Sequence, residues 1–359
     1  MKKILVVLLT LGMLCGCQNM KDDNVIKIGA ILPLTGSYAD VGNWIKQGID
    51  IAIEEINKKQ DSYKMYVYYE DSEGNTTKAV SAYSKMRVMH DPQIYMVTVS
   101  PIAIALKPLM KRDSVISIVQ SAHRDVIGND CPLIFRYCLT IKQEAECIYS
   151  SMKTLHNVDL DSQISLLYVN NEIGNEFCTE FVSNSKFNNV KTYSYEPTDM
   201  DLKNIVTSVL NNPTEHIVIS GYTKNYGILV RRLREYGYDG KIFANQGFST
   251  NSVREAAGRA GNNVFYDDYY LPYNPKIEKL ERLLHKKYGA DLCPMHITSY
   301  NMMHMIANSC NEIGSTSPKA IVKYWHDKGC FNINESELKI IPQEQDIYIP
   351  IQLKENVYE

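Results

Sequence analysis

Residues 26–57, IKIGAILPLTGSYADVGNWIKQGIDIAIEEIN, decide the fold of this chain. The stretch opens with a mostly apolar run whose length and branched side chains are typical of a strand buried on both faces. Thr35-Gly36-Ser37 predicts a turn, because glycine supplies backbone freedom and the hydroxyls can bond nearby amides. Apolar residues then recur at helical spacing from Val41 to Ile56. A strand, a hydroxyl-rich loop and a helix in this order open an α/β sheet, whose ligands bind beyond the carboxyl ends of the strands.

The alternation of strand and helix continues along the chain. Apolar patterns predict further strands at 63–69, 93–99, 115–119, 163–169, 191–195, 216–220, 241–244 and 264–271, with the last strands between 340 and 353. Helical patterns lie between them at 76–89, 101–112, 142–156, 175–185, 202–210 and 224–236, and again at 275–288 and 295–311. Short apolar strands separated by helices indicate βαβ units and parallel sheets, so the fold class is α/β.

Several motifs make the chain resemble type I periplasmic solute-binding proteins, the branched-chain amino-acid (Leu/Ile/Val)-binding family of ABC transporters. Pro33-Leu34-Thr35-Gly36 matches that family's Pro-x-[ST]-G after the first strand, and Ile56-Asn57 ends the following helix as the family does. Further matches are Tyr69-Glu70-Asp71, Phe135-Arg136, Gly221-Tyr222, Tyr236-Gly237 and Tyr288-Gly289. The resemblance extends over nearly all of residues 26–355.

The resemblance implies two doubly wound, Rossmann-like lobes with parallel sheets, a hinge of three crossings and a solute cleft at that hinge. Residues 26–138 and 271–338 are expected to form the N-terminal lobe. Residues 139–270 and 339–359 are expected to form the C-terminal lobe.

The first residues predict a lipoprotein signal peptide over 1–16 and a polar tether over 17–25. Lys2 and Lys3 precede a short apolar core, and Leu14-Cys15-Gly16-Cys17 resembles the lipobox of bacterial lipoproteins. Cleavage before Cys17 and acylation of its thiol would anchor the chain in the bacterial cell envelope, on the periplasmic or extracellular side of a membrane. An ordinary secretory signal or a single membrane anchor is the alternative.

Composition narrows the classes of partner and chemistry. A formal net charge of −3 and the lack of any basic run argue against nucleic acid as a partner. No hydrolase elbow, phosphate-binding loop or zinc-protease motif occurs, so neither an enzyme nor a cofactor is expected. His296, Tyr300 and His304 share a helical face with several methionines and suit copper, but packing of an amphipathic helix explains them better, and no metal site is expected. The cysteines do not demand a disulfide.

Candidate ligand-binding residues follow the predicted strands. Thr35 and Ser37 come after the first strand, and Ser100 precedes Pro101 as a predicted helix N-cap with free backbone amides. The resemblance adds Ser100 as a ligand-contacting serine, Ala122 as a contacting backbone and His123 at a position that usually holds a small hydroxyl. It also adds Tyr222 and Gln246 from the second lobe, although Tyr222 can serve packing alone.

Gln246 bears on the identity of the solute. The resembled family commonly has at this position an acidic residue that holds the α-ammonium of an amino acid. A neutral amide cannot supply that charge, and a buried ammonium without a counter-ion costs several kcal/mol. Asp267 or Asp268 is a candidate substitute. Without one, a small solute bearing a carboxylate or an amide is expected, and leucine, isoleucine and valine are disfavoured.

The sequence therefore predicts a lipid-anchored, monomeric solute-binding protein that closes two lobes on a small polar solute, an amino acid or related compound, and presents it to an ABC permease. The alternative is a ligand-sensing accessory lipoprotein of a signalling system with the same fold.

Overall fold

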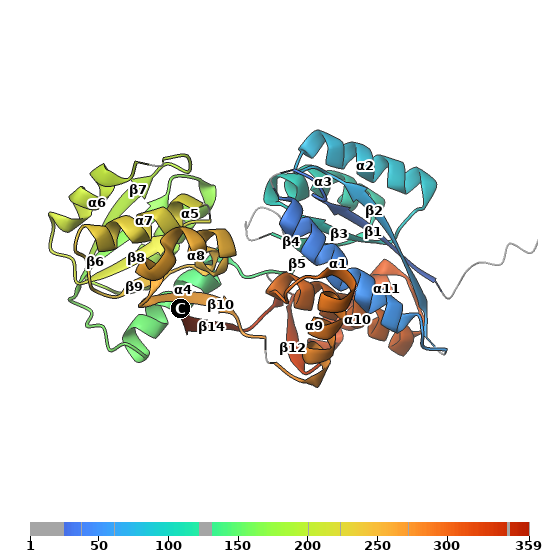
Figure 1. Ribbon diagram of the computed structural model, residues 1–359. Helices are drawn as coiled ribbons and strands as arrows, with labels where there is room; N and C mark the ends of the chain where they lie inside the picture. The colour runs from blue at the N-terminus through green and yellow to red at the C-terminus, as the bar shows by residue number, and fades with distance from the viewer. Residues whose placement is uncertain are drawn as a thin grey trace, which may run out of the picture.

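The computed structural model describes residues 25–36, 38–60, 62–121, 131–199, 201–222, 224–271, 273–342 and 345–358. These residues form two α/β bodies that lie side by side, each built on its own sheet (Figure 1). The eight-stranded sheet with its helices is called the first lobe below, and the six-stranded sheet with its helices the second lobe. In the described part of the chain, no helix combines the length and the apolar content that crossing a bilayer requires.

The first lobe has the strand order β11-β12-β13-β5-β4-β3-β1-β2. Its strands are β1 (Val25–Leu32), β2 (Lys64–Asp71), β3 (Ile94–Thr98), β4 (Ile116–Gln120), β5 (Ile134–Arg136), β11 (Cys330–Ile333), β12 (Ser336–Ile341) and β13 (Asp346–Tyr348). Its helices are α1 (Ala39–Ile56), α2 (Thr76–Met89), α3 (Ser100–Asp113), α9 (Pro275–Tyr288), α10 (Pro294–Ile313) and α11 (Pro318–Lys328). Helices α1, α9, α10 and α11 share one apolar core with the sheet, and α2 and α3 share another. The lobe is doubly wound, as predicted.

The second lobe has the strand order β14-β10-β9-β8-β6-β7, and only β14 runs antiparallel to its neighbour. Its strands are β6 (Gln163–Val169), β7 (Asn189–Tyr195), β8 (His216–Ser220), β9 (Ile242–Ala244), β10 (Val264–Tyr269) and β14 (Ile351–Glu355). Its helices are α4 (Ile141–Thr154), α5 (Glu172–Asn184), α6 (Lys203–Leu210), α7 (Lys224–Glu235) and α8 (Asn251–Ala257), with short 3₁₀ helices η2 (Gln246–Ser249) and η3 (Gly258–Gly261). Helices α4 and α5 pack in one apolar core, and α6, α7 and α8 line the other.

The chain passes between the two sheets three times, as predicted: after β5, after β10 and between β13 and β14. A buried ion pair lies at these crossings. Arg136 Nε and Nη2 donate hydrogen bonds of 2.7 Å each to the two carboxylate oxygens of Asp346. The first crossing ends at α4, where Thr140 and Gln143 form a capping box. Both ends of the first crossing are therefore fixed by side-chain hydrogen bonds.

The sequence predicted that residues 339–359 belong to the second lobe, and the start of this segment at residue 339 is wrong. Strands β12 and β13 belong to the first sheet, and only β14 joins the second. The cause is a two-residue hairpin between β11 and β12, in which Asn334 and Glu335 both have positive φ, 51° and 65°. This hairpin folds residues 336–341 back onto β11, and β13 then pairs with β5.

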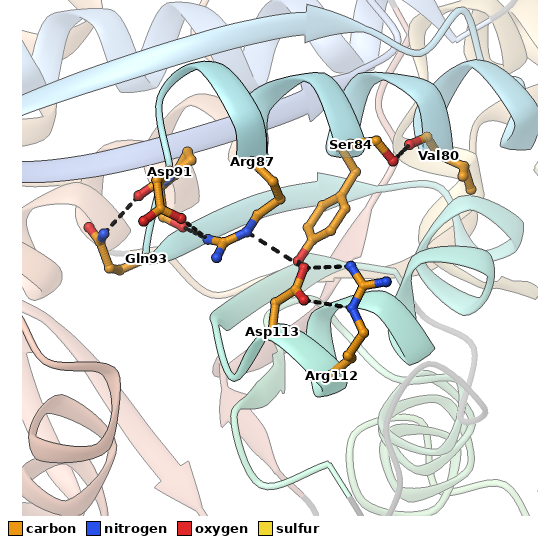
Figure 2. Close-up of polar contacts among 9 residues, drawn as sticks. Val80, Ser84, Arg87, Asp91, Gln93, Arg112 and Asp113 are labelled. Atoms are coloured by element: carbon orange, nitrogen blue, oxygen red, sulfur yellow. Dashed lines mark hydrogen bonds and ion pairs between the residues drawn. The ribbon is translucent and has the colours of Figure 1, made fainter.

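Charged side chains tie α2 to α3 in the first lobe (Figure 2). Arg87 lies 2.7 Å from Asp91 and 3.5 Å from Asp113, which also pairs with Arg112. Tyr83 Oη donates a 2.8 Å hydrogen bond to the same Asp113. These contacts hold the end of α3 against α2, while the start of α3 faces the region where the strands end.

The residues considered for copper serve packing. His296 is buried, its Nε2 lies 2.8 Å from Gln47 Oε1, and burial lowers its pKa to about 4. Tyr300 Oη donates to Glu55 Oε2 at 2.5 Å, and the His304 ring packs edge-on against the Tyr300 ring. Over the described ranges, no group of three or more His, Cys, Asp or Glu side chains is placed to hold a metal ion. None of the seven cysteines within those ranges forms a disulfide.

Candidate functional site

Thr35 follows β1 and is held by Asp71 at the end of the neighbouring β2. Thr35 Oγ1 donates a 2.6 Å hydrogen bond to Asp71 Oδ2, and the Leu34 amide donates to Oδ1 at 2.8 Å. Burial raises the pKa of Asp71, but these bonds and one from the Glu73 amide outweigh it and hold the pKa below its usual value. Thr35 is exposed at the edge of the sheet, with its hydroxyl proton directed to Asp71.

Ser100 and Ser121 meet at the ends of β3 and β4. Their hydroxyl oxygens lie 2.5 Å apart, and either can be the donor. Helix α3 starts at Ser100 itself, with Val99 at the cap position, so the prediction of Ser100 as N-cap is wrong by one residue. Val99 has φ 74°, a conformation that costs a β-branched residue about 1–3 kcal/mol and is concentrated at functional sites. The Ser100 hydroxyl thus bonds with a neighbouring strand end and does not serve as the N-cap of α3.

Four predicted residues lie outside the described residues. They are Ser37, Ala122, His123 and the lipidation residue Cys17. Their roles remain predictions.

In the second lobe, Tyr222 and Asn245 converge on a glutamate that the sequence did not indicate. Tyr222 Oη donates a 2.8 Å hydrogen bond to Glu144 Oε2, and Asn245 Nδ2 donates to the same oxygen at 2.9 Å. Asn245 is itself held by the Gly221 amide, which donates to its Oδ1 at 3.0 Å. Three elements thus meet at one carboxylate: the first turn of α4, the loop after β8 and the residue after β9.

Glu144 is buried, with a relative exposure of 2%. Burial raises the pKa of its carboxyl group from 4.5 to about 7, although the hydrogen bonds from Asn245 and Tyr222 lower it. The negative charge of Glu176 on α5 adds to the rise. Burial therefore disfavours the ionised form of this carboxyl group.

Gln246 does not reach this cluster. It is half-buried in η2, and its Nε2 donates to Ser249 Oγ at 3.2 Å. Of its two proposed substitutes, Asp268 pairs with Lys354 at 2.7 Å. Asp267 is fully buried, and neither of its oxygens has a hydrogen-bond partner of good geometry in the described part of the chain. Burial and the nearby Glu144 raise the pKa of Asp267 well above its usual value, which favours its protonated form.

Cys138 on the first crossing connects the two halves of the site. Burial raises the pKa of its thiol to about 12, and the charge of Glu144 adds to that rise. The backbone of Ser121 hydrogen-bonds the thiol and opposes the rise. Cys138 is therefore within electrostatic reach of Glu144 in the second lobe and in contact with Ser121 in the first.

Sequence reasoning missed Glu144, although a signal was present. The buried face of α4 comprises Ile141, Ala145, Ile148 and Met152, and Glu144 occupies that face at helical spacing. An acidic residue among the buried positions of an amphipathic helix is uncommon unless it is paired or functional.

The site and the fold together define a class of protein. Two α/β lobes joined by three short crossings, with polar groups gathered where the strands of both sheets end, are typical of proteins that hold a small molecule between two lobes. The model of the family described as periplasmic binding protein matches residues 25–332, and the chain belongs to this family. The resemblance seen in the sequence is thereby confirmed, and the chain is a binding protein rather than an enzyme.

Known relatives agree with this assignment. The chain is 24% identical over 311 residues to the Leu/Ile/Val-binding protein homolog 3 of Brucella melitensis, and the aligned region covers 84% of this chain and 83% of the relative. The structure resembles that of a leucine-binding protein from Thermotoga maritima, with a TM-score of 0.77, 19% identity and coverage of 92% and 95%. It also resembles a solute-binding protein of an ABC transporter from Rhodopseudomonas palustris in complex with 3,4-dihydroxybenzoic acid, with a TM-score of 0.76, 16% identity and coverage of 92% and 93%. The two structural likenesses show the fold.

Proposed function

We propose that this chain is the extracytoplasmic solute-binding protein of an ABC importer, anchored to a membrane through a lipid on Cys17. It binds a small polar solute, an amino acid or a related compound, between its two lobes and acts as a monomer. Hinge closure at the three crossings presents the solute to the permease.

One observation carries this proposal: each lobe has a group of hydrogen-bonded polar side chains beside the first crossing. The Ser100–Ser121 pair lies at the edge of the first sheet, and the Glu144–Tyr222–Asn245 cluster lies at the edge of the second. Only residues 137–140 separate β5 from α4. A solute bound between the two groups would contact both lobes and would stabilise their closed arrangement.

The names of relatives support import over signalling. The Rhodopseudomonas palustris protein is named as a component of an ABC transporter, and the Brucella melitensis relative as a Leu/Ile/Val-binding homologue. Both the importer subunit and the sensing accessory protein would use the same binding step, so the test of binding applies to each.

Native mass spectrometry of freshly purified protein tests the binding function. We expect a mass excess over the polypeptide that disappears on denaturation, because a closed binding protein retains its solute during purification. A control purified through a urea-unfolding and refolding cycle should lack the excess and regain it in a filtered cell extract. A chain that binds nothing in either sample would contradict the proposal.

A further inference from the structure

The two hydrogen bonds that Glu144 accepts do not require a charged side chain. Both of its hydrogen bonds, from Tyr222 Oη and Asn245 Nδ2, end on the single oxygen Oε2. The carbonyl oxygen of a glutamine could accept both bonds. A buried carboxylate carries a desolvation cost that a buried amide avoids. The acid at this position therefore has a role beyond holding two neighbours.

No protein cation compensates this acid. Among the described residues, no lysine or arginine forms an ion pair with Glu144, and the charged groups that act on it include the acid Glu176 but no cation. The two cations beside the hinge are engaged elsewhere, since Arg136 pairs with Asp346 and Lys354 pairs with Asp268. A cationic ligand would supply the counter-ion that this buried acid lacks.

The position of Glu144 also suits contact with a solute. Its Oε1 accepts no hydrogen bond from the described residues, because both donors point at Oε2. The carboxylate lies in the first turn of α4, directly after the crossing. Cys138 of that crossing contacts the backbone of Ser121 in the first lobe. Glu144 thus lies on the second-lobe side of the first crossing, within electrostatic reach of Cys138.

We propose that Glu144 is the anionic group of the solute site, and that the solute presents a protonated amine to it. The inference rests on the proposed function, and it names the chemical class of the solute. The expectation drawn from the neutral Gln246 was a small solute bearing a carboxylate or an amide, and Glu144 adds an anionic partner for an amine. An ammonium group supplies the missing positive charge and can donate to Oε1 in a charge-assisted hydrogen bond.

Matched pairs of probes test the inference. The probes are the twenty common L-amino acids and the carboxylic acids of the same carbon skeletons without the amine. Each is screened by thermal shift at pH 7.5, and those that bind are titrated by calorimetry. The proteins are the wild type, Glu144→Gln and, as a control, Glu146→Gln, which lies on the exposed side of the same helix. Any solute released from the purified wild type is treated with dansyl chloride, which labels amines.

We expect that the probes which bind carry the amine and that their deaminated partners bind about 100-fold more weakly, as for loss of one partner of a buried charge pair. Glu144→Gln should lose about 100-fold in affinity and remain folded, whereas Glu146→Gln should match the wild type. A deaminated acid that binds within about threefold of its amino acid, or full affinity in Glu144→Gln, overturns the inference and leaves the proposed function intact. Failure of every amino acid together with a released solute that dansyl chloride does not label also overturns it. Absence of any bound or released solute overturns the proposed function as well.

Discussion

Tyr222 Oη donates a 2.8 Å hydrogen bond to Glu144 Oε2, and this bond joins the loop after β8 to the first turn of α4. Tyr222 was predicted to contact the solute, whereas Glu144 was not predicted at all. Asn245 holds the same oxygen from a third element. The orientation of the carboxylate is thus fixed before any solute arrives, and preorganisation of this kind reduces the cost of binding.

The first prediction concerns the stability of Glu144→Gln. The native carboxyl group has a pKa of about 7 against 4.5 when it is solvated, so the folded protein holds a proton between these pH values that the unfolded chain releases. The wild type therefore loses stability as pH rises from 4.5 through 7. The amide has no such loss. Glu144→Gln should be more stable than the wild type by up to about 3 kcal/mol at pH 8 and equal to it near pH 4.5, measured by urea unfolding without solute.

The control for this measurement is Glu146→Gln, which removes an exposed carboxylate from the same helix. Its stability difference from the wild type should not change between the two pH values. A Glu144→Gln protein that is less stable than the wild type at pH 8 would show that the carboxylate holds the fold together.

A second prediction concerns the pH dependence of binding, given the proposed amine-bearing solute. Binding requires the ionised carboxylate and the protonated amine, so affinity should be greatest between about pH 8 and the pKa of the amine, and it should fall about tenfold per pH unit well below 7. The titratable groups that interact electrostatically with Glu144 lie on five elements and the first crossing: Cys138 on the crossing, Cys147 on α4, Glu176 on α5, Tyr222 after β8, Tyr226 on α7, and Asp267 and Tyr269 on β10. Calorimetry in two buffers of different ionisation enthalpy should detect proton release at pH 6.5. Proton uptake, or affinity that rises as pH falls, would be inconsistent with this role.

The hinge provides a third prediction. Asp346→Asn leaves Arg136 buried without its carboxylate and should cost about 3–5 kcal/mol of folding free energy. Replacement of both partners by apolar residues, Arg136→Met with Asp346→Leu, should recover much of this loss. Asp327→Asn, which breaks the exposed pair with Lys323, serves as the control and should change stability little. Urea unfolding curves measure all three, and an Asp346→Asn protein as stable as the wild type would show that the pair does not hold the hinge.

The lipid anchor gives a fourth prediction. Cys17→Ala should abolish acylation and move the protein into the soluble fraction, because no helix in the described part of the chain is long and apolar enough to hold it in a bilayer. Cys15→Ala is the matched control, since that residue precedes the cleavage site, and this variant should remain in the membrane fraction. Membrane retention of Cys17→Ala in detergent-free extracts would show that another segment anchors the chain.

Most of the fold could be predicted because its strands are short, branched and buried on both faces. Residues of β1 show this directly: Ile28 and Ala30 face one core and Ile31 faces the other. The lobe assignment failed for residues 339–341 and 346–348, because Asn334-Glu335 makes a two-residue turn without the glycine that normally indicates one. Helix α11 was not predicted, although Ser317-Pro318 is an ordinary helix start.

The candidate site was predicted less well, for a physical reason. Residues that follow strands can be proposed from the strand pattern, as Ser100 was, and the resemblance added Tyr222; the role of both in binding stays a prediction. Glu144 lies within a helix, and its position in the helical pattern predicts that it is buried, whereas its residue type predicts that it is exposed. Only the three-dimensional structure shows that Tyr222 and Asn245 resolve this conflict by supplying hydrogen bonds.

Small-angle X-ray scattering tests the central claim, closure of two lobes on a solute, most directly. The radius of gyration is measured for protein stripped of solute by unfolding and refolding, and again after saturation with the solute identified from the purified chain. We expect the radius to fall on saturation in the wild type. Glu144→Gln at the same solute concentration should keep the larger value. An unchanged radius in wild-type protein that calorimetry shows to be saturated would contradict hinge closure and, with it, the proposed mechanism of solute capture.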